Sequence, residues 1–296
     1  MKKSSFIKYA GVLLSGMLFF QKGISQLNIP GTGYFQNQYL LNPAMSGQTA
    51  KQVRFGMGYQ QSGNIKDGPQ TYYLTGDYGF NERVGAGINL FYDKAGLVNT
   101  YKVMGTYSYH IPLDERHQLH FGLSAGGVQH RLNNRSISGD LDDPLLYNYN
   151  DQFMRFEADF GMAYTDGKLT VQAAAPNLVS TFRKGDKDLV NRALFFGTVS
   201  YRLNLSDDNE DWSVEPKVAY RGIKGIKSII DAGANLTYKD IVNVFGMYHT
   251  NKSASAGVGL KVSNVVQVTA LYNTQASEFK TYSGGDYAIG LLIQLD

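Results

Sequence analysis

The feature that most constrains this chain is a period of two in its hydropathy, which begins at Gln52 and continues to the C-terminus. In residues 153–165, apolar Met154, Phe156 and Phe160 alternate with charged or small residues. Successive side chains of a strand point to opposite faces, so this pattern predicts strands with one apolar face. Fourteen such segments follow one another, at 52–61, 70–80, 83–93, 98–111, 117–131, 153–165, 168–175, 190–205, 212–221, 228–238, 241–249, 253–262, 265–273 and 285–295.

The connections between these segments tend to alternate in length. Short turns fall near 81–82, 112–116, 166–167, 206–211, 239–240 and 263–264, and most of the intervening loops are longer. Short turns on one rim and longer loops on the other are typical of an outer-membrane barrel, in which closure pairs every backbone group inside the bilayer. We therefore predict an all-β fold, a transmembrane outer-membrane β-barrel of about 14 antiparallel strands.

Composition separates this barrel from its alternatives. A soluble β-sandwich or lipocalin-like barrel would carry more Lys and Glu on its solvent face, whereas only 18% of these residues are charged, against roughly 25% in ordinary globular domains. After the first 25 residues no apolar run approaches the ~20 residues of a membrane-spanning helix. The absence of cysteine excludes a disulfide scaffold, a thiolate metal site and a lipoprotein anchor.

The N-terminus has the anatomy of a secretory signal peptide over residues 1–25. Lys2, Lys3 and Lys8 precede an apolar run, Ala10–Phe20, and small residues lead to the expected cleavage site after Ser25. The alternative, an uncleaved anchor, is disfavoured because the run is short. The segment holds 4 of the 28 basic residues and no acidic one, so the mature chain carries 24 − 25 = −1. This charge gives no argument for nucleic-acid binding.

Residues 26–51 form an N-terminal segment before the barrel, which we assign to residues 52–296. A fourteen-stranded barrel is wide enough that its lumen must hold water, a plug or a ligand. The aromatic and leucine side chains of the segment could anchor it as a plug inside the barrel or in contact with periplasmic partners. These are Tyr34, Phe35, Tyr39, Leu40 and Leu41. The strand phase turns charges of both signs inward, which predicts ion pairs across the lumen; the set is Arg54, Arg83, Lys102, Arg155, Glu157, Asp159, Arg192, Arg202, Glu215, Lys217 and Asp231.

A search for reactive chemistry finds little. His117 and His120 are three residues apart, which places them on opposite faces of a strand and argues against joint metal binding. The acidic stretch 138–144 could bind Ca²⁺, although an ordinary solvated loop is the better interpretation. Gly85 and Gly87 lie within a strand with no helix after them, so they predict a bend of the barrel or a place of close packing, and not a phosphate loop. We expect no catalytic residue, metal or cofactor.

Two local motifs carry a resemblance to a known family. The first, FQNQYLLNPAMSG, spans 35–47, and the second, DGPQTYYLTGDYGF, spans 67–80. Together they resemble the PorP/SprF family of type IX secretion system outer-membrane proteins of Bacteroidota. The usual alanine before the proline of the second motif is absent here, and the chain does not end in the aromatic residue common in such barrels. The matching positions are Gln38, Tyr39, Asn42, Pro43, Ala44, Gly47, Gly68, Pro69 and Thr71.

The resemblance implies a non-enzymatic role in the cell outer membrane. Such proteins work with a periplasmic ring and a translocon, and they support secretion or surface anchoring of large cargo with a C-terminal sorting domain, including adhesins of gliding motility. Pro69 needs no functional explanation, because proline favours tight turns. Residues 42–47 could be a structural plug or a contact for partners. The alternative function is transport of a small hydrophobic or polar solute. We expect external partners at loops 132–152, 176–189 and 274–284 and periplasmic partners at the short turns.

Overall fold

The computed structural model describes residues 34–63, 68–132, 153–183, 193–205, 211–223, 227–274 and 284–296. The expected signal peptide, the acidic stretch 138–144 and Arg192 lie outside the described residues, as do residues 26–33 and most of the loops 132–152 and 274–284. Among the described residues, no helix is both long and apolar enough to cross a membrane.

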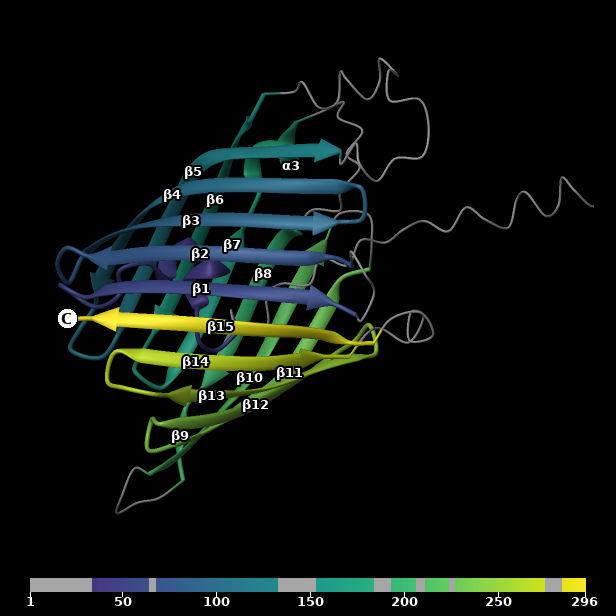
Figure 1. Ribbon diagram of the computed structural model, residues 1–296. Coiled ribbons are helices and arrows are strands. Elements are labelled where there is room, and N and C mark those ends of the chain that lie inside the picture. The colour runs from purple at the N-terminus through teal and green to yellow at the C-terminus, as the bar shows by residue number, and fades with distance from the viewer. Residues whose placement is uncertain are drawn as a thin grey trace, which may run out of the picture.

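The described residues form one antiparallel sheet that closes on itself (Figure 1). Each strand pairs with the next in the chain, except that β8 and β9 both pair with β10, and the ring is completed where β1 pairs with β15. The strands are β1 (Val53–Ser62), β2 (Gln70–Gly79), β3 (Val84–Ala95), β4 (Val98–Pro112), β5 (Gln118–Leu132), β6 (Arg155–Thr165), β7 (Leu169–Ala175), β8 (Ala193–Tyr201), β9 (Leu203–Asn204), β10 (Trp212–Ile223), β11 (Ile229–Tyr238), β12 (Val242–His249), β13 (Ser253–Lys261), β14 (Val266–Asn273) and β15 (Asp286–Leu295).

The predicted fold is confirmed. The two-residue β9 continues β8 beyond Arg202 and pairs with the same neighbour, β10, so the barrel wall has fourteen strands. Each segment expected from the hydropathy corresponds to one strand, with ends that shift by a few residues, and the segment 190–205 contains both β8 and β9. The period of two was therefore sufficient to locate the wall of the barrel.

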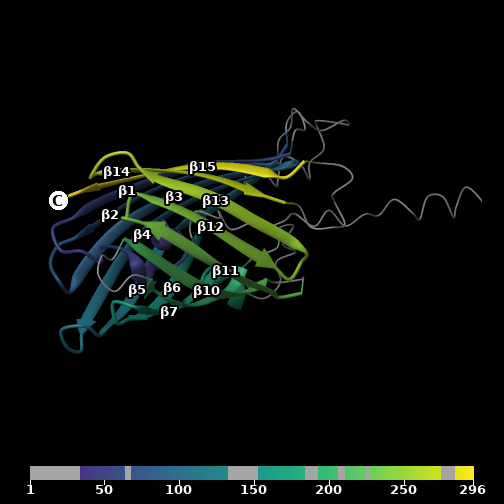
Figure 2. The same ribbon diagram turned by 90° about the horizontal axis from the view of Figure 1, so that it is seen from below.

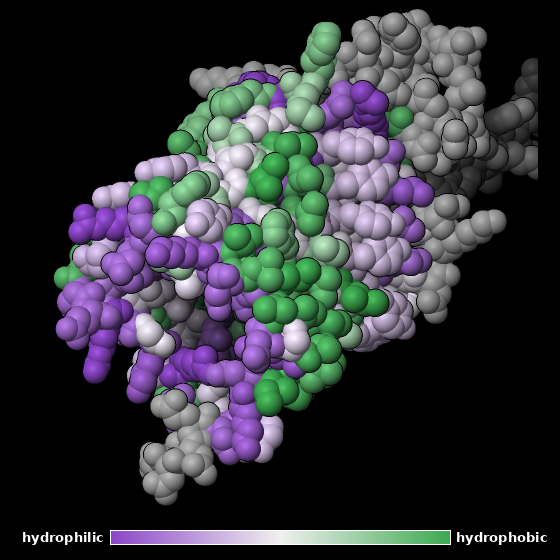
Figure 3. Space-filling model, turned by 60° about the vertical axis from the view of Figure 1, so that its left-hand side comes forward, coloured by the Kyte–Doolittle hydropathy of each residue, from purple (hydrophilic) through white to green (hydrophobic). Residues whose placement is uncertain are grey.

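Side chains alternate between the lumen and the outside on each strand. On β4, Thr106, Ser108 and His110 are buried, whereas Tyr107 and Tyr109 between them are exposed. Exposed large apolar side chains recur on the same outward phase around the barrel. Figure 3 shows part of this surface as a green apolar zone, with purple side chains gathered at one end of the barrel. An apolar outer face on a closed sheet is what the hydrocarbon of a bilayer requires.

Tyrosine rings form a row on the outer surface near the rim of the longer loops. Ring centroids of neighbouring pairs are 4.8 Å apart for Tyr59 and Tyr72, 5.9 Å for Tyr72 and Tyr92, and 4.9 Å for Tyr92 and Tyr101. Tyr272 and Tyr287 make a similar pair on β14 and β15 at 5.1 Å. Tyrosine at this level matches the aromatic girdle of outer-membrane barrels, because its ring is apolar and its hydroxyl remains hydrated.

Candidate functional site: a luminal segment with two anchors

Residues 34–51, called the luminal segment below, lie inside the barrel. They include two short 3-10 helices, η3 (Gln38–Leu40) and η4 (Pro43–Met45). The purple helices are enclosed by the ring of strands in both views (Figures 1 and 2). Side-chain hydrogen bonds from the segment reach Thr75 on β2, Thr106 on β4 and Asp231 on β11, so the segment touches well-separated parts of the wall.

The segment is held at two places, which we name separately. The turn anchor comprises residues 37–47, which pack against β2–β7 near the rim of the short turns. The tyrosine anchor comprises Tyr34 and Phe35, which pack against β8 and β10–β12 nearer the rim of the longer loops. The segment leaves the lumen where Ala50 bridges Gly79 and Lys51 leads into β1.

Asn42 organises the turn anchor. It is fully buried; its Oδ1 accepts from the backbone N–H of Ala44 at 3.0 Å, which caps η4, and Pro43 occupies the first helical position. Its Nδ2 donates to the carbonyl of Met162 at 3.1 Å and to Oε1 of Gln172 at 3.2 Å. One amide therefore shapes the turn and also fastens it to the barrel wall.

Two glycines of the wall make room for this turn. A Cβ on Gly122 would lie 2.2 Å from the carbonyl carbon of Pro43, and one on Gly161 would lie 2.0 Å from Oδ1 of Asn42. Both distances are below any real contact, so the backbone of the segment rests directly on the backbone of β5 at Gly122, and the side chains of Asn42 and Pro43 rest on the backbone of β6 at Gly161. Close packing was also expected at Gly87, where a Cβ would lie 2.6 Å from the Tyr39 hydroxyl; the expectation is confirmed.

Gly47 ends the turn anchor in a left-handed conformation, with φ of 60°. Its N–H donates to Oδ2 of Asp77 at 2.7 Å, and a Cβ there would lie 2.6 Å from Tyr78 O. Asp77 is paired with Arg54 at 2.7 Å, and the same guanidinium donates to the carbonyl of Met45 at 2.7 Å. Glycine is thus required here by both the backbone angle and the space.

A chain of neutral hydrogen bonds links the turn anchor to β4, β5 and β6. The Ser46 carbonyl can only accept, so Nε2 of His110 donates to it at 3.1 Å. In the neutral form, Nδ1 of His110 then accepts from Nδ1 of His120 at 2.8 Å, and Nε2 of His120 accepts from the Thr165 hydroxyl at 2.9 Å. Each histidine tautomer is fixed by its neighbour.

Gln38 and Tyr39 complete the turn anchor. Oε1 of Gln38 accepts from Nε2 of Gln172 at 2.6 Å, and the Tyr39 hydroxyl donates to Thr106 at 2.8 Å. Burial raises the pKa of Tyr39 well above its usual value, so the phenol remains protonated and keeps its role as donor. All the polar contacts of these two side chains in the described structure are with uncharged groups.

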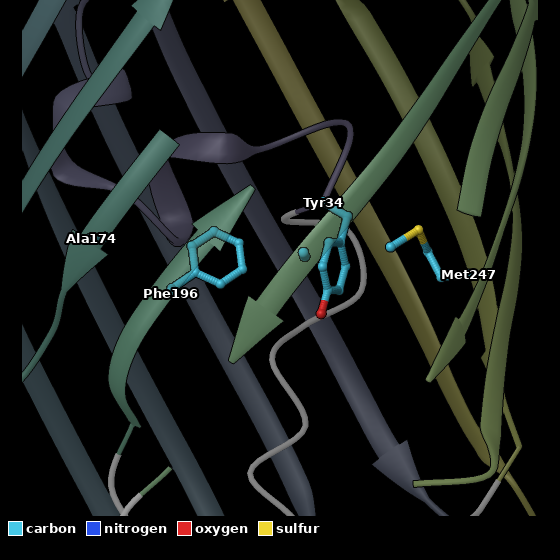
Figure 4. Packing of buried hydrophobic residues seen from close by; sticks show 5 residues of the cluster. Tyr34, Ala174, Phe196 and Met247 are labelled. Carbon is cyan, nitrogen blue, oxygen red and sulfur yellow. The ribbon is translucent and has the colours of Figure 1, made fainter. Parts of the chain in front are cut away.

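The tyrosine anchor is built differently. The ring of Tyr34 lies between Phe196 and Met247 (Figure 4), in a buried apolar cluster that also includes Ala174 and Ala219. The Tyr34 hydroxyl donates to Oδ2 of Asp231 at 2.5 Å, and burial raises the pKa of Tyr34 well above its usual value. An apolar slot therefore holds the ring, and a buried carboxylate holds its polar end.

Asp231 is the centre of a buried charged network. Arg221 donates to both its oxygens, from Nε at 2.7 Å and from Nη2 at 2.8 Å. Nδ1 of His249 lies 2.5 Å from Oδ1, and Nε2 of His249 lies 2.7 Å from Oγ of Ser255. The carboxylate is fully saturated with donors, which is the condition for keeping a charge buried.

Ser255, His249 and Asp231 are joined by hydrogen bonds in the same order as the catalytic triad of serine hydrolases. In this barrel the carboxylate is already neutralised by Arg221, and Ser255 and His249 are only 7% and 5% exposed. The ring of Tyr34 lies 6.5 Å from that of His249. This arrangement positions the segment.

Lys217 completes the tyrosine anchor. Its Nζ donates to the backbone carbonyl of Tyr34, lies 3.2 Å from Glu215 and stands 4.5 Å from the centre of the Phe35 ring. The side chain is 2% exposed. The lysine therefore binds the segment by a charge-assisted hydrogen bond and a cation–π contact.

The second sequence motif does not meet the first. Pro69 is exposed at the rim of the longer loops, where its carbonyl accepts from the N–H of Ser62 at 2.9 Å. Thr71 donates to Asp93 on β3 at 2.6 Å, and Gly68 is buried beside Pro69. The structure therefore puts Gln38, Tyr39, Asn42, Pro43, Ala44 and Gly47 in the lumen, and Gly68, Pro69 and Thr71 at a rim.

The ion pairs that the structure gives for the inward-facing charged residues do not cross the lumen. Arg54 and Asp77 stand directly opposite on neighbouring strands, and Lys102 reaches Asp159 from β4 to β6 at 2.7 Å. Opposite parts of the wall are linked by the luminal segment instead. Sequence reasoning also missed Arg221 and His249, although both share the inward phase of their strands, with Lys217 and Asn243 respectively.

Part of the stretch after β7 folds back onto the inward face of β6. Glu157 accepts from the backbone N–H of Val179 at 2.8 Å, and Asp159 accepts from that of Asn177 at 2.8 Å. These contacts fix the short helix α3 (Leu178–Phe182) at the mouth of the barrel. Among the residues that the structure describes, no group of three His, Asp or Glu side chains could hold a metal ion.

Solved structures similar to this chain are outer-membrane barrels. Omp33 of Acinetobacter baumannii is 9% identical over 83% of this chain and 99% of its own, with a TM-score of 0.47. The CymD monoaromatic hydrocarbon channel is 13% identical over 90% and 92%, at 0.46, and the KdgM porin is 9% identical over 83% and 99%, at 0.41. These scores are below 0.5, and the barrel assignment rests on the strand pairing itself.

Sequence comparison identifies the family. No curated protein sequence matches the chain. Residues 25–292 match the family described as type IX secretion system membrane protein PorP/SprF, which is nearly the whole length. With its closed ring of fourteen strands, the chain is a multi-pass barrel of the outer membrane and belongs to the PorP/SprF family of type IX secretion system membrane proteins.

Proposed function

We propose that this protein supports the secretion or surface anchoring of large cargo proteins with a C-terminal sorting domain, through protein–protein contacts. The family supports a role as an outer-membrane component of the type IX system and contact with other secretion proteins. The partners proposed here are a periplasmic ring or translocon subunits, and the cargo class includes adhesins of gliding motility. No catalytic step is part of this function.

The observation that carries the proposal is the luminal segment. It joins Thr75, Thr106 and Asp231 on different parts of the wall through buried hydrogen bonds. A barrel whose interior is bridged in this way is better suited to hold partners at its rims than to conduct a solute. We propose that residues 26–51 act as a plug and that residues 1–25 are the signal peptide that exports the chain.

The rims are where partners would bind. The short turns, which include Glu82 and Glu115, would face the periplasm, and the longer loops would face the outside. Loops carried by a rigid scaffold are the usual place for recognition. Gly68, Pro69 and Thr71 lie at the rim of the longer loops, which in this proposal faces the outside, and the lumen motif would act on partners only through the shape of the barrel.

The test is a mild-detergent pull-down of the tagged protein from native outer membranes, with partners identified by mass spectrometry. Because the chain has no cysteine, single variants Glu82→Cys, Glu115→Cys and Leu97→Cys allow crosslinking from each rim. Val218→Cys, which faces the bilayer, is the matched control. We expect ring, translocon or sorting-domain proteins to be captured from the rim positions and not from the control. A barrel that always purifies alone would contradict the proposal.

A further inference from the structure

One seam of the barrel differs from the others. Between β8–β9 and β10, the register shifts at Gly222 and Ile223, and the pairing stops between Lys217–Ser200 and Val214–Leu203. The other described strand pairs run in continuous register. The ladder between β8–β9 and β10 is therefore interrupted twice within one seam.

Pro216 explains the central interruption. Continuing the register places it opposite Tyr201. The bond from the Leu205 N–H to the Trp212 carbonyl fixes which residues exchange hydrogen bonds, and by alternation Tyr201 and Pro216 are such a pair. Proline has no N–H to donate, so this bond is missing from the seam. Arg202, the next residue, turns its N–H to Lys168 on the other side.

The tyrosine anchor lies on the inner face of this seam. Tyr34 packs on Phe196 of β8 and on Ala219 of β10, and its carbonyl accepts from Lys217 of β10. Its hydroxyl continues to Asp231 of β11. One residue of the luminal segment thus touches both strands of the seam, along the paired stretch that lies between its two interruptions.

The outer face of the seam presents apolar side chains to the bilayer. Val199 and Val218 stand directly opposite each other across it, and both are exposed, as are Phe195 and Tyr220 nearby. An opening here would join the lumen to hydrocarbon and not to water. Only an apolar chain could use it without leaving polar groups unpaired in lipid.

We propose that the β8–β10 seam is a lateral exit from the lumen to the bilayer, held shut from inside by Tyr34, and that it admits an apolar chain such as a lipid acyl chain. The exit does not depend on the secretion role, so it is tested without any secretion assay. The seam opens when the ring of Tyr34 leaves its slot between Phe196 and Met247.

Hydrogen exchange of the full chain in nanodiscs, followed by mass spectrometry, tests the opening. We expect amides of β8 and β10 to exchange at least tenfold faster than those of β13 and β14, which pair without interruption. Tyr34→Ala should widen this difference, and the milder Tyr34→Phe, which removes only the hydroxyl, should widen it less. Pro216→Val returns the missing N–H and should slow exchange in this seam alone. Equal protection of both seams in every variant would overturn the proposal.

Entry of an apolar chain is tested with a phospholipid that carries a photoactivatable diazirine on its acyl chain. In Tyr34→Ala nanodiscs we expect adducts on inward-facing Phe196 and Lys217 as well as on outward residues. The pair Val199→Cys with Val218→Cys, oxidised to a disulfide, should abolish the inward adducts in that background. The matched control is a disulfide between Leu260→Cys and Val268→Cys, which are directly opposite on β13 and β14, and it should leave the inward adducts unchanged. Adducts confined to outward residues in all variants would refute the exit.

Discussion

The two anchors of the luminal segment hold it by different physics. At the turn anchor, the backbone of Pro43 and Ala44 rests on the wall at Gly122, the side chains of Asn42 and Pro43 rest on it at Gly161, and most of the hydrogen bonds are neutral. At the tyrosine anchor, Asp231 accepts from the Tyr34 hydroxyl, Arg221 neutralises Asp231, and Lys217 donates to the Tyr34 carbonyl; all three side chains are charged and buried. The turn anchor depends on the close fit between the segment and the wall, whereas the tyrosine anchor depends on buried charges that must all stay paired.

This difference predicts how each anchor fails. A shape fit is lost in proportion to the volume that intrudes, since tightly packed interiors tolerate little added volume. A buried ionic network fails when one member is removed, because the remaining charges lose their partners but cannot reach water. Single substitutions should therefore destabilise the tyrosine anchor more than the turn anchor.

The largest effect is expected from Asp231→Asn. The change keeps the shape of the side chain and leaves Arg221 buried without its counter-charge, which costs about 3–5 kcal/mol of unfolding free energy. Denaturant unfolding in detergent, followed by the fluorescence of the single tryptophan, Trp212, measures it. The control is Asp240→Asn, which breaks the exposed pair with Arg202 at 2.7 Å and should cost less than about 1 kcal/mol. Equal losses for the two variants would show that the buried network contributes no more than a surface pair.

Gly122→Ala tests the turn anchor. The new Cβ would meet the backbone of Pro43 and Ala44 at 2.2–2.4 Å, so the turn must move away from the wall, at a cost of about 2–3 kcal/mol. Gly105→Ala is the control, because that glycine faces outward with its nearest atom at 3.9 Å. Protease sensitivity of the segment should rise only in the first variant. If both variants were equally stable, the fit between η4 and β5 would not hold the segment.

Asn42→Ala removes hydrogen bonds from the same anchor without adding volume. It loses the cap of η4 and the bonds to Met162 and Gln172, which together contribute about 1–2 kcal/mol. Thermal unfolding in detergent measures the loss. Gln48→Ala is the control, since the one side-chain contact the structure gives it is with the Met45 sulfur at 3.5 Å. A loss as large as that of Asp231→Asn would contradict the distinction between the anchors.

Much of the wall could be predicted from the sequence, and little of the lumen. A period of two places Lys217 and Asp231 on the inward face, because strand geometry alone decides it. Which inward residues meet depends on the register between strands and on where the segment enters. Neither is written in local sequence, so Arg221 and His249 were not singled out and ion pairs were expected across the lumen.

The glycines show the same limit from another side. Gly87 was expected to mark close packing, but Gly122 and Gly161 have no sequence context that distinguishes them from other strand glycines. Their role depends on η4, more than seventy positions earlier in the chain. The positions of the family motif were identifiable, whereas the separation of its two parts between lumen and rim needed the barrel to be closed.

The smallest effect on stability should come from an exposed histidine–carboxylate contact that resembles the buried one at the tyrosine anchor. Nδ1 of His117 lies 2.6 Å from Asp114 in an exposed turn, much as Nδ1 of His249 lies 2.5 Å from Asp231 inside the barrel. Backbone N–H groups of Arg116 and His117 lower the pKa of Asp114 to about 2, and the His117 side chain adds to this. Because the folded pKa lies below the ordinary value near 3.9, this contact stabilises the turn above about pH 4 and is lost as pH falls toward 2.

Asp114→Asn should therefore leave global unfolding almost unchanged and speed hydrogen exchange only within residues 113–117. In the original chain, exchange in this turn, corrected for its intrinsic dependence on pH, should rise between pH 4 and pH 2, and in the variant it should not. Residues of the turn between β6 and β7 serve as the internal control, since Asp166 accepts from Lys168 and Leu169 in the same way and keeps its own pH response in both proteins. If Asp114→Asn destabilised the barrel as much as Asp231→Asn, then the chemistry of the carboxylate–histidine contact, and not its burial, would decide the strength of the tyrosine anchor.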